Sequence, residues 1–242
     1  MDLYELFKSH RNAKIGGGYD PKRILFHQLN ILMRNDLITE KDGEEIDDWF
    51  GSHPEFKENI YCKENVRGRI PFIICPNPAN YTTYEALVKA VDLGDQKRNT
   101  LFLDSKKITD TCSPKKNNFT ASIVCGIETG IMAKNDLLKG KTLAKADDFF
   151  LKGIETTGSQ QKSERIFFYE ALMLLIYYPE ILDVWDGIQA AGSYYESDNK
   201  RQSLRLYWLN DRPWRFLKIA KEESPIFDKR FVAPKVGERF TF

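Results

Sequence analysis

The sequence predicts an α+β fold in which a helical N-terminal part packs on a mixed or antiparallel sheet around a central buried helix. Residues 166–178 are all apolar or aromatic except Glu170, and such a helix must be covered on most sides. Residues 204–209 and 214–220 are strand-like runs on either side of a turn-type segment, which is typical of a hairpin. Helical and strand patterns also alternate without a regular βαβ period, which favours a mixed or antiparallel sheet.

The composition limits the class of protein. The chain has 242 residues, of which 42% are hydrophobic and 13% aromatic, enough for an ordinary packed core. Its formal charge of +1 gives no overall reason to expect nucleic acid or membrane as a partner. The first residues lack the apolar stretch of a secretory signal, and the apolar block would span only about 20 Å as a helix. We therefore expect a cytoplasmic protein with no membrane contact.

Residues 1–65 are predicted to form a helical N-terminal part. Residues 2–12 suit a short helix, and residues 23–36 place three leucines on one face of a second helix. Thr39, followed three residues later by Asp42, predicts a capping box at the start of a third helix.

Residues 66–242 are predicted to form the α+β domain, as one cooperative unit with the N-terminal part. Ser163 is the predicted N-cap of the apolar helix, and Gly192 to Tyr195 the predicted turn that follows it. The other predicted elements are, in order, a strand over 70–75, a helix over 81–91, a strand over 100–104, a polar loop over 105–118, a strand over 119–127 and a helix over 143–154.

Cysteine and histidine residues show no ligand spacing. The four cysteines contain no C-x-x-C pair, and all three histidines lie in the N-terminal part. We therefore predict no metal site and no cofactor. Cys75 and Cys125 lie in apolar strand-like runs and are expected to be small buried core residues.

Glu170 allows two interpretations because an ionised carboxylate inside a buried helix is costly unless it is paired. The structural interpretation is an ion pair with an arginine, or a position on a solvated strip. The functional interpretation is a carboxylate that faces a cleft. In that case Glu170, Asp104 and Asp211 are the candidate catalytic residues of a carboxylate-centred enzyme, including a nuclease-like, metal-dependent hydrolase. This alternative requires carboxylates within about 10 Å of each other.

The C-terminal hairpin is the candidate binding surface. Residues 200–218 carry six basic residues and one acid, with aromatic residues between them. Alternation along the strand predicts that Leu204 and Leu206 face the core and that Arg205 and Tyr207 face outward. The candidate binding residues are Ser193, Tyr194, Arg205, Tyr207, Arg212 and Arg215.

These observations favour a non-catalytic binding or interaction module over an enzyme. A protein partner is expected, and nucleic acid is the alternative because arginines and aromatic rings can bind single strands. Self-association is a further possibility, since the net charge of −7 over residues 36–58 complements the net charge of +5 over residues 200–218.

Several short motifs, in order, resemble a family of small bacterial proteins of unknown function. That family has an F-I-I-P-like strand, an E-G-x-A-L helix, an H-P-E-x-L stop, a G-S-R turn and a closing hairpin. The matching segments here are residues 70–76, 101–104, 169–172, 178–182, 192–193 and 206–214. Tyr178, Ala171 and Tyr194 stand where the family often has His, Gly and Arg. The resemblance covers about residues 65–240 and implies a shared fold without implying a reaction.

Overall fold

The structure, a computed structural model, describes residues 21–53, 69–76, 84–91, 105–110, 121–128, 165–179, 181–184, 187–198, 200–211, 214–222, 234, 236 and 239–241. The described helices are α2 (Pro21–Arg34), α3 (Glu40–Ser52), α5 (Tyr84–Ala90), α8 (Phe168–Tyr177) and α9 (Ile181–Val184), with a 3-10 turn, η2 (Ser105–Lys107). The described strands are β1 (Arg69–Pro76), β2 (Ile108–Asp110), β3 (Ala121–Glu128), β4 (Ile188–Ser197), β5 (Lys200–Asp211), β6 (Trp214–Glu222) and β7 (Arg239–Thr241).

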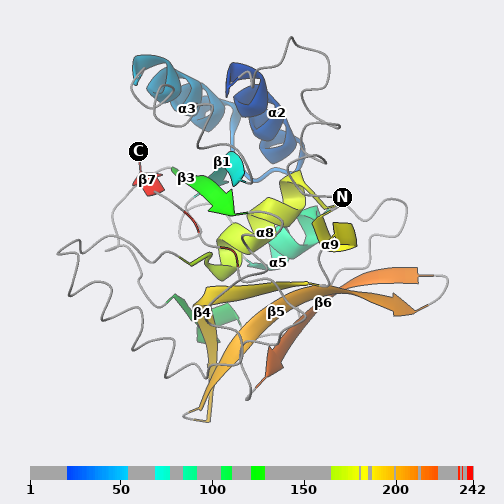
Figure 1. Cartoon of the computed structure of the whole chain (residues 1–242). Helices are drawn as coiled ribbons and strands as arrows, with labels where there is room; N and C mark the ends of the chain where they lie inside the picture. Colours follow the sequence, from blue (N-terminus) through cyan, green and yellow to red (C-terminus); the bar gives the residue numbers. More distant parts are fainter. Residues whose placement is uncertain are drawn as a thin grey trace.

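The architecture is α+β, as the sequence predicts. The strands form two sheets, one in the order β1-β3-β7 and the other in the order β2-β4-β5-β6, and every described pairing is antiparallel. Helix α8 lies between the two sheets, while α2 and α3 lie on the far side of the three-stranded sheet (Figure 1).

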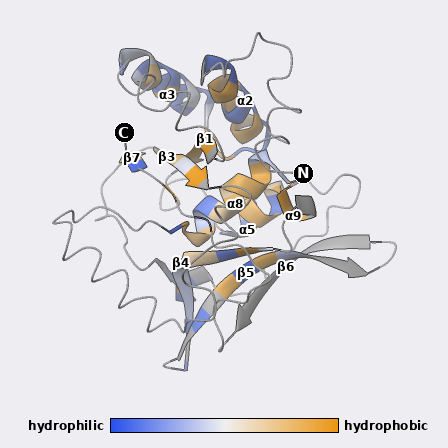
Figure 2. Ribbon diagram, in the orientation of Figure 1, coloured by the Kyte–Doolittle hydropathy of each residue, from blue (hydrophilic) through white to orange (hydrophobic). Residues whose placement is uncertain are grey.

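Helix α8 is the centre of the hydrophobic core. All of its residues are buried, and it packs against β1, β4, α5 and α2. Figure 2 shows it as mostly hydrophobic, in contrast to the more hydrophilic α3. The predicted central buried helix is therefore confirmed. Its start is not, because the N-cap position is Phe167 and Ser163 lies outside the described residues.

Helix α3 begins as the sequence predicts. The hydroxyl of Thr39 accepts the N–H of Asp42 at 3.2 Å, and the carboxylate of Asp42 accepts the N–H of Thr39 at 2.8 Å. The two bonds satisfy N–H groups that have no partner within the helix. The capping box is confirmed.

Strand β1 lies at an edge of the three-stranded sheet, and a side chain of α2 occupies its free side. The amide of Gln28 is fully buried, donates to the carbonyl of Phe72 at 3.0 Å and accepts the N–H of Ile74 at 2.8 Å. These are the bonds that a neighbouring strand would make, so Gln28 closes part of this edge.

The C-terminal hairpin is confirmed, with β5 and β6 in continuous register from Ser203↔Glu222 to Asp211↔Trp214. The predicted turn over Gly192 to Tyr195 is wrong, because these residues lie inside β4. The pairing of β4 with β5 shifts register between Gln189 and Tyr194 instead of turning.

The predicted loop over 105–118 is also partly wrong, since it contains η2 and β2. Ile108 of β2 pairs with Tyr195 and packs against the core, which gives this polar segment one apolar anchor. The strands predicted over 70–75 and 119–127 are confirmed as β1 and β3, and α5 confirms most of the helix predicted over 81–91. The helices predicted over 2–12 and 143–154, the strand over 100–104 and the domain boundary near residue 65 lie outside the described residues.

Candidate functional site

Glu170 forms a buried ion pair at the first turn of α8. Its side chain is 0% exposed, and its two carboxylate oxygens accept the Nε–H and Nη2–H groups of Arg239 at 2.6 and 2.8 Å. One of these oxygens also accepts the N–H of Phe167 at 2.8 Å. The structure therefore shows the paired arrangement of Glu170, which is the structural interpretation of this residue.

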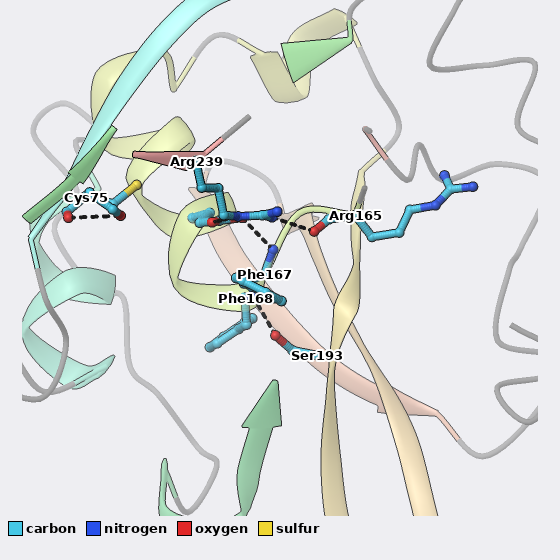
Figure 3. Close-up of polar contacts among 8 residues, drawn as sticks. Cys75, Arg165, Phe167, Phe168, Ser193 and Arg239 are labelled. Carbon is cyan, nitrogen blue, oxygen red and sulfur yellow. Dashed lines mark hydrogen bonds and ion pairs between the residues drawn. The ribbon is translucent and has the colours of Figure 1, made fainter. Parts of the chain in front are cut away.

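Arg239 of β7 joins several elements at this point (Figure 3). Its Nη2 also donates to the carbonyl of Arg165 at 2.7 Å, and its guanidinium lies 4.3 Å from the centre of the Phe167 ring. Burial lowers the pKa of Arg239, but the charge and hydrogen bonds of Glu170 outweigh that effect and leave the pKa raised. Arg239 therefore stays charged and fixes β7 to the start of α8. The side chain of Arg165 points away from this ion pair.

Ser193 supplies a cap for α8 from a strand. Its hydroxyl accepts the N–H of Phe168 at 2.8 Å, and the residue is 1% exposed (Figure 3). We expected Ser193 to lie in an exposed turn, so its position in the interior is a correction. The bond satisfies one of the N–H groups that have no partner within the first turn of the helix.

Gly192 allows β4 to approach the segment before α8. Its N–H donates to the carbonyl of Ile166 at 2.9 Å. A Cβ atom at this position would lie 2.7 Å from Cδ1 of Phe167 and 2.9 Å from the carbonyl oxygens of Arg165 and Ile166. Close contact of the two backbones, and not a turn, therefore explains the glycine.

The face of the four-stranded sheet away from α8, here the outer face, carries three of the predicted binding residues. Leu204 and Leu206 belong to the same hydrophobic core as α8, so Arg205 and Tyr207 lie on the outer face, as alternation predicts. Tyr194 pairs in register with Ser203 and lies on the same face.

Arg205 does not form the bare surface that we expected. It is 1% exposed and lies directly opposite Gln189, which is also 1% exposed. Tyr194 is buried and Tyr207 is half-buried. The outer face is therefore covered around the Gln189–Arg205 pair. The alternation of side chains along one strand predicts which face a residue lies on, but it does not predict whether other parts of the chain cover that face.

The other candidate residues are described only in part. Asp104 and Arg212 lie outside the described residues, and Asp211 and Arg215 are described in their backbones alone. The convergence of Glu170 with Asp104 and Asp211 therefore stays a prediction.

Two buried thiols lie in the three-stranded sheet. Cys75 and Cys125 are free and buried in β1 and β3, which confirms their predicted role as core residues. Burial, followed by the negative charge of Glu170, raises the pKa of the Cys75 thiol well above its ordinary value. A thiol in this state is protonated at neutral pH and is a poor nucleophile.

The described segments contain neither a cluster of metal-ligating side chains nor a membrane-spanning helix. No group of three or more His, Cys, Asp or Glu side chains there could hold a metal ion. No helix described in those segments is both long and apolar enough to cross a membrane.

The hairpin β5–β6 is the most basic described part of the chain. In Figure 1 its two strands extend beyond the helices at one end. The two strands carry six basic and two acidic residues, a net charge of +4. These residues are Lys200, Arg201, Arg205, Arg215, Lys218 and Lys221, with Asp211 and Glu222.

The acidic helix α3 lies on the opposite side of α8 from the hairpin (Figure 1). Its exposed acidic residues are Glu40, Glu44, Glu45 and Asp48. The described part of the acidic segment therefore does not screen the hairpin within one chain.

Arg239 and Gln28 are the residues that sequence reasoning missed. A lone carboxylate in a buried helix signals that a cation is needed, but the chain has 36 Lys and Arg residues and no local pattern selects Arg239. Gln28 lies on the buried side of an amphipathic helix, where a polar residue signals an internal hydrogen bond without naming the partner.

Comparison of the chain with protein-family models, curated proteins and solved structures gave no match. The resemblance to the bacterial family therefore stays a prediction.

Proposed function

We propose that this protein is a binding module that engages another protein through the hairpin β5–β6. The observation that carries the proposal is the hairpin itself, which extends beyond the helices and has a net charge of +4 (Figure 1). Opposite charge on a partner speeds encounter and selects against partners of like charge.

A protein partner is favoured over nucleic acid because of Arg205. A single-strand binding sheet needs arginines and aromatic rings that bases and phosphates can reach. Arg205 is 1% exposed, so bases and phosphates cannot reach it, and Tyr207 is half-buried.

A binding role is also favoured over the carboxylate-centred enzyme. The carboxylate of Glu170 accepts three hydrogen bonds and has no exposed surface. A general base must reach the proton that it removes, and a nucleophile must reach its substrate.

Tryptophan fluorescence offers a direct test because Trp208 and Trp214 belong to the hairpin strands. The protein is titrated with a nine-residue peptide that alternates Glu and Thr, and separately with a single-stranded thymidine oligomer, at low and at physiological salt. We expect saturable binding of the peptide and a flat titration with the oligomer. Oligomer binding that weakens steeply with salt would instead assign the hairpin to nucleic acid.

A pair of charge-reversal variants provides the control. Arg215→Glu with Lys221→Glu should weaken peptide binding by about tenfold or more, because these two residues share a face of β6 and two favourable charge pairs become repulsive. Lys106→Glu with Lys107→Glu reverses two exposed lysines beside the opposite edge of the same sheet and should change binding less than about twofold. Equal effects of the two pairs would contradict the proposed site.

A further inference from the structure

The described sheets have four edge strands, and three of them are blunted. The free side of β1 is occupied by the side chain of Gln28. Strands β2 and β7 have only three residues each. Strand β6 has nine residues, and no described strand pairs with its outer side. Proteins commonly close or shorten exposed edges, so a long open edge is a candidate for strand addition.

The backbone of β6 can support such an addition. In an antiparallel pair, residues alternate between those that bond to the neighbour and those whose N–H and C=O groups point the other way. Strand β6 pairs with β5 without a register shift along its whole length. Roughly every second residue of β6 therefore directs its backbone groups toward the open side.

The charges of β6 favour an acidic partner over a second copy. The strand contains Arg215, Lys218 and Lys221 against a single acid, Glu222. Two copies that paired antiparallel about Lys218 would place Lys218 opposite itself and Arg215 opposite Lys221. Like charges in directly opposed positions are destabilising, whereas each opposite-charge pair contributes about 0.2–1 kcal/mol.

We propose that β6 is a docking edge for an extended, acidic segment of a partner protein, which adds as a fifth strand to the four-stranded sheet. The inference rests on the proposed function and specifies the chemistry of the partner. Main-chain hydrogen bonds hold the segment. Alternation places Arg215 and Lys221 on one face of β6 and Lys218 on the other, so acidic residues at every second position of the segment pair with Arg215 and Lys221.

Backbone N-methylation of the peptide tests this geometry without changing the protein. Two versions of the nine-residue Glu-Thr peptide are made, one methylated at odd and the other at even positions. In a paired strand only one set of N–H groups faces β6, so one version should bind at least about tenfold more weakly than the other. A one-residue slip that restored the bonds would move every Glu from the face of Arg215 and Lys221 to the face of Lys218 and Glu222, so it would lose favourable charge pairs.

The outcomes separate this inference from the proposed function. Equal binding of both methylated peptides and the parent peptide shows attraction without strand pairing, which overturns the inference and leaves the proposed function standing. No binding by the parent peptide contradicts the proposed function as well. A dimer of the free protein, measured by light scattering and dissociated by the parent peptide, would assign the edge to a second copy and also overturn the inference.

Discussion

Replacing Arg239 with methionine tests the buried ion pair. Glu170 is 0% exposed, so in Arg239→Met its carboxylate keeps the N–H of Phe167 at 2.8 Å and loses both guanidinium bonds. Removing one partner of a buried ion pair costs about 3–5 kcal/mol, and we expect the free energy of unfolding to fall by that amount. The methionine side chain keeps an apolar contact with Phe167, so most of the loss is electrostatic.

Changing the other partner of the ion pair, in Glu170→Gln, should cost less stability than Arg239→Met. In Glu170→Gln the new amide oxygen can still accept the N–H of Phe167. The side chain of Arg239 is 14% exposed and can turn part of its charge toward water. We expect a loss of about 1–3 kcal/mol, and the double variant should cost about 2 kcal/mol less than the sum of the two single variants.

Urea unfolding monitored by tryptophan fluorescence measures all three variants, and the shift in midpoint at constant slope gives the change in stability. The reasoning is refuted if Arg239→Met costs less than about 1 kcal/mol, or if Glu170→Gln costs as much as Arg239→Met. Either result would mean that water or another group compensates the carboxylate.

Three further predictions concern packing, capping and pH. Gly192→Ala should cost about 1–3 kcal/mol in urea unfolding, because the new Cβ would lie 2.7 Å from Phe167 and two backbone oxygens would block its escape; a neutral effect would refute the close approach. Thr39→Ala should cost about 1 kcal/mol by the same assay, through loss of the cap of α3, and an unchanged midpoint would contradict the role of the capping box. Because burial raises the pKa of Cys75, the folded protein should lose about 1.4 kcal/mol of stability per pH unit above about pH 8.5, the value of the unfolded thiol. Unfolding at pH 7 and pH 10 should show a smaller decline for Cys75→Ala, and equal declines would show that this thiol does not contribute.

Local sequence patterns were sufficient for several elements. The apolar block identifies α8 because a helix without a polar face has to be interior. Thr39 and Asp42 identify the start of α3 because both partners of the capping box lie within four residues. The hairpin follows from two alternating runs around a short turn-type segment.

Long-range contacts account for what the sequence did not show. Arg239 is 69 residues from Glu170, and Ser193 is 25 residues from the N–H group that it caps. Gly192 and Ser193 have the composition of a turn, yet here they serve close packing and capping. The alternation of side chains along β5 correctly predicts that Arg205 lies on the outer face. It does not predict that Arg205 is buried, because burial depends on what covers the sheet.

Gln28 has a consequence for the order of folding. Strand β1 is apolar and lies at a sheet edge. If β1 formed before α2 packed against it, the strand would expose unpaired backbone groups and would be prone to aggregate with other nascent chains. Helix α2 precedes β1 in the sequence and is therefore synthesised first. The amide that shields the strand is thus already available when the strand leaves the ribosome, and the order of the two elements itself protects the chain from aggregation.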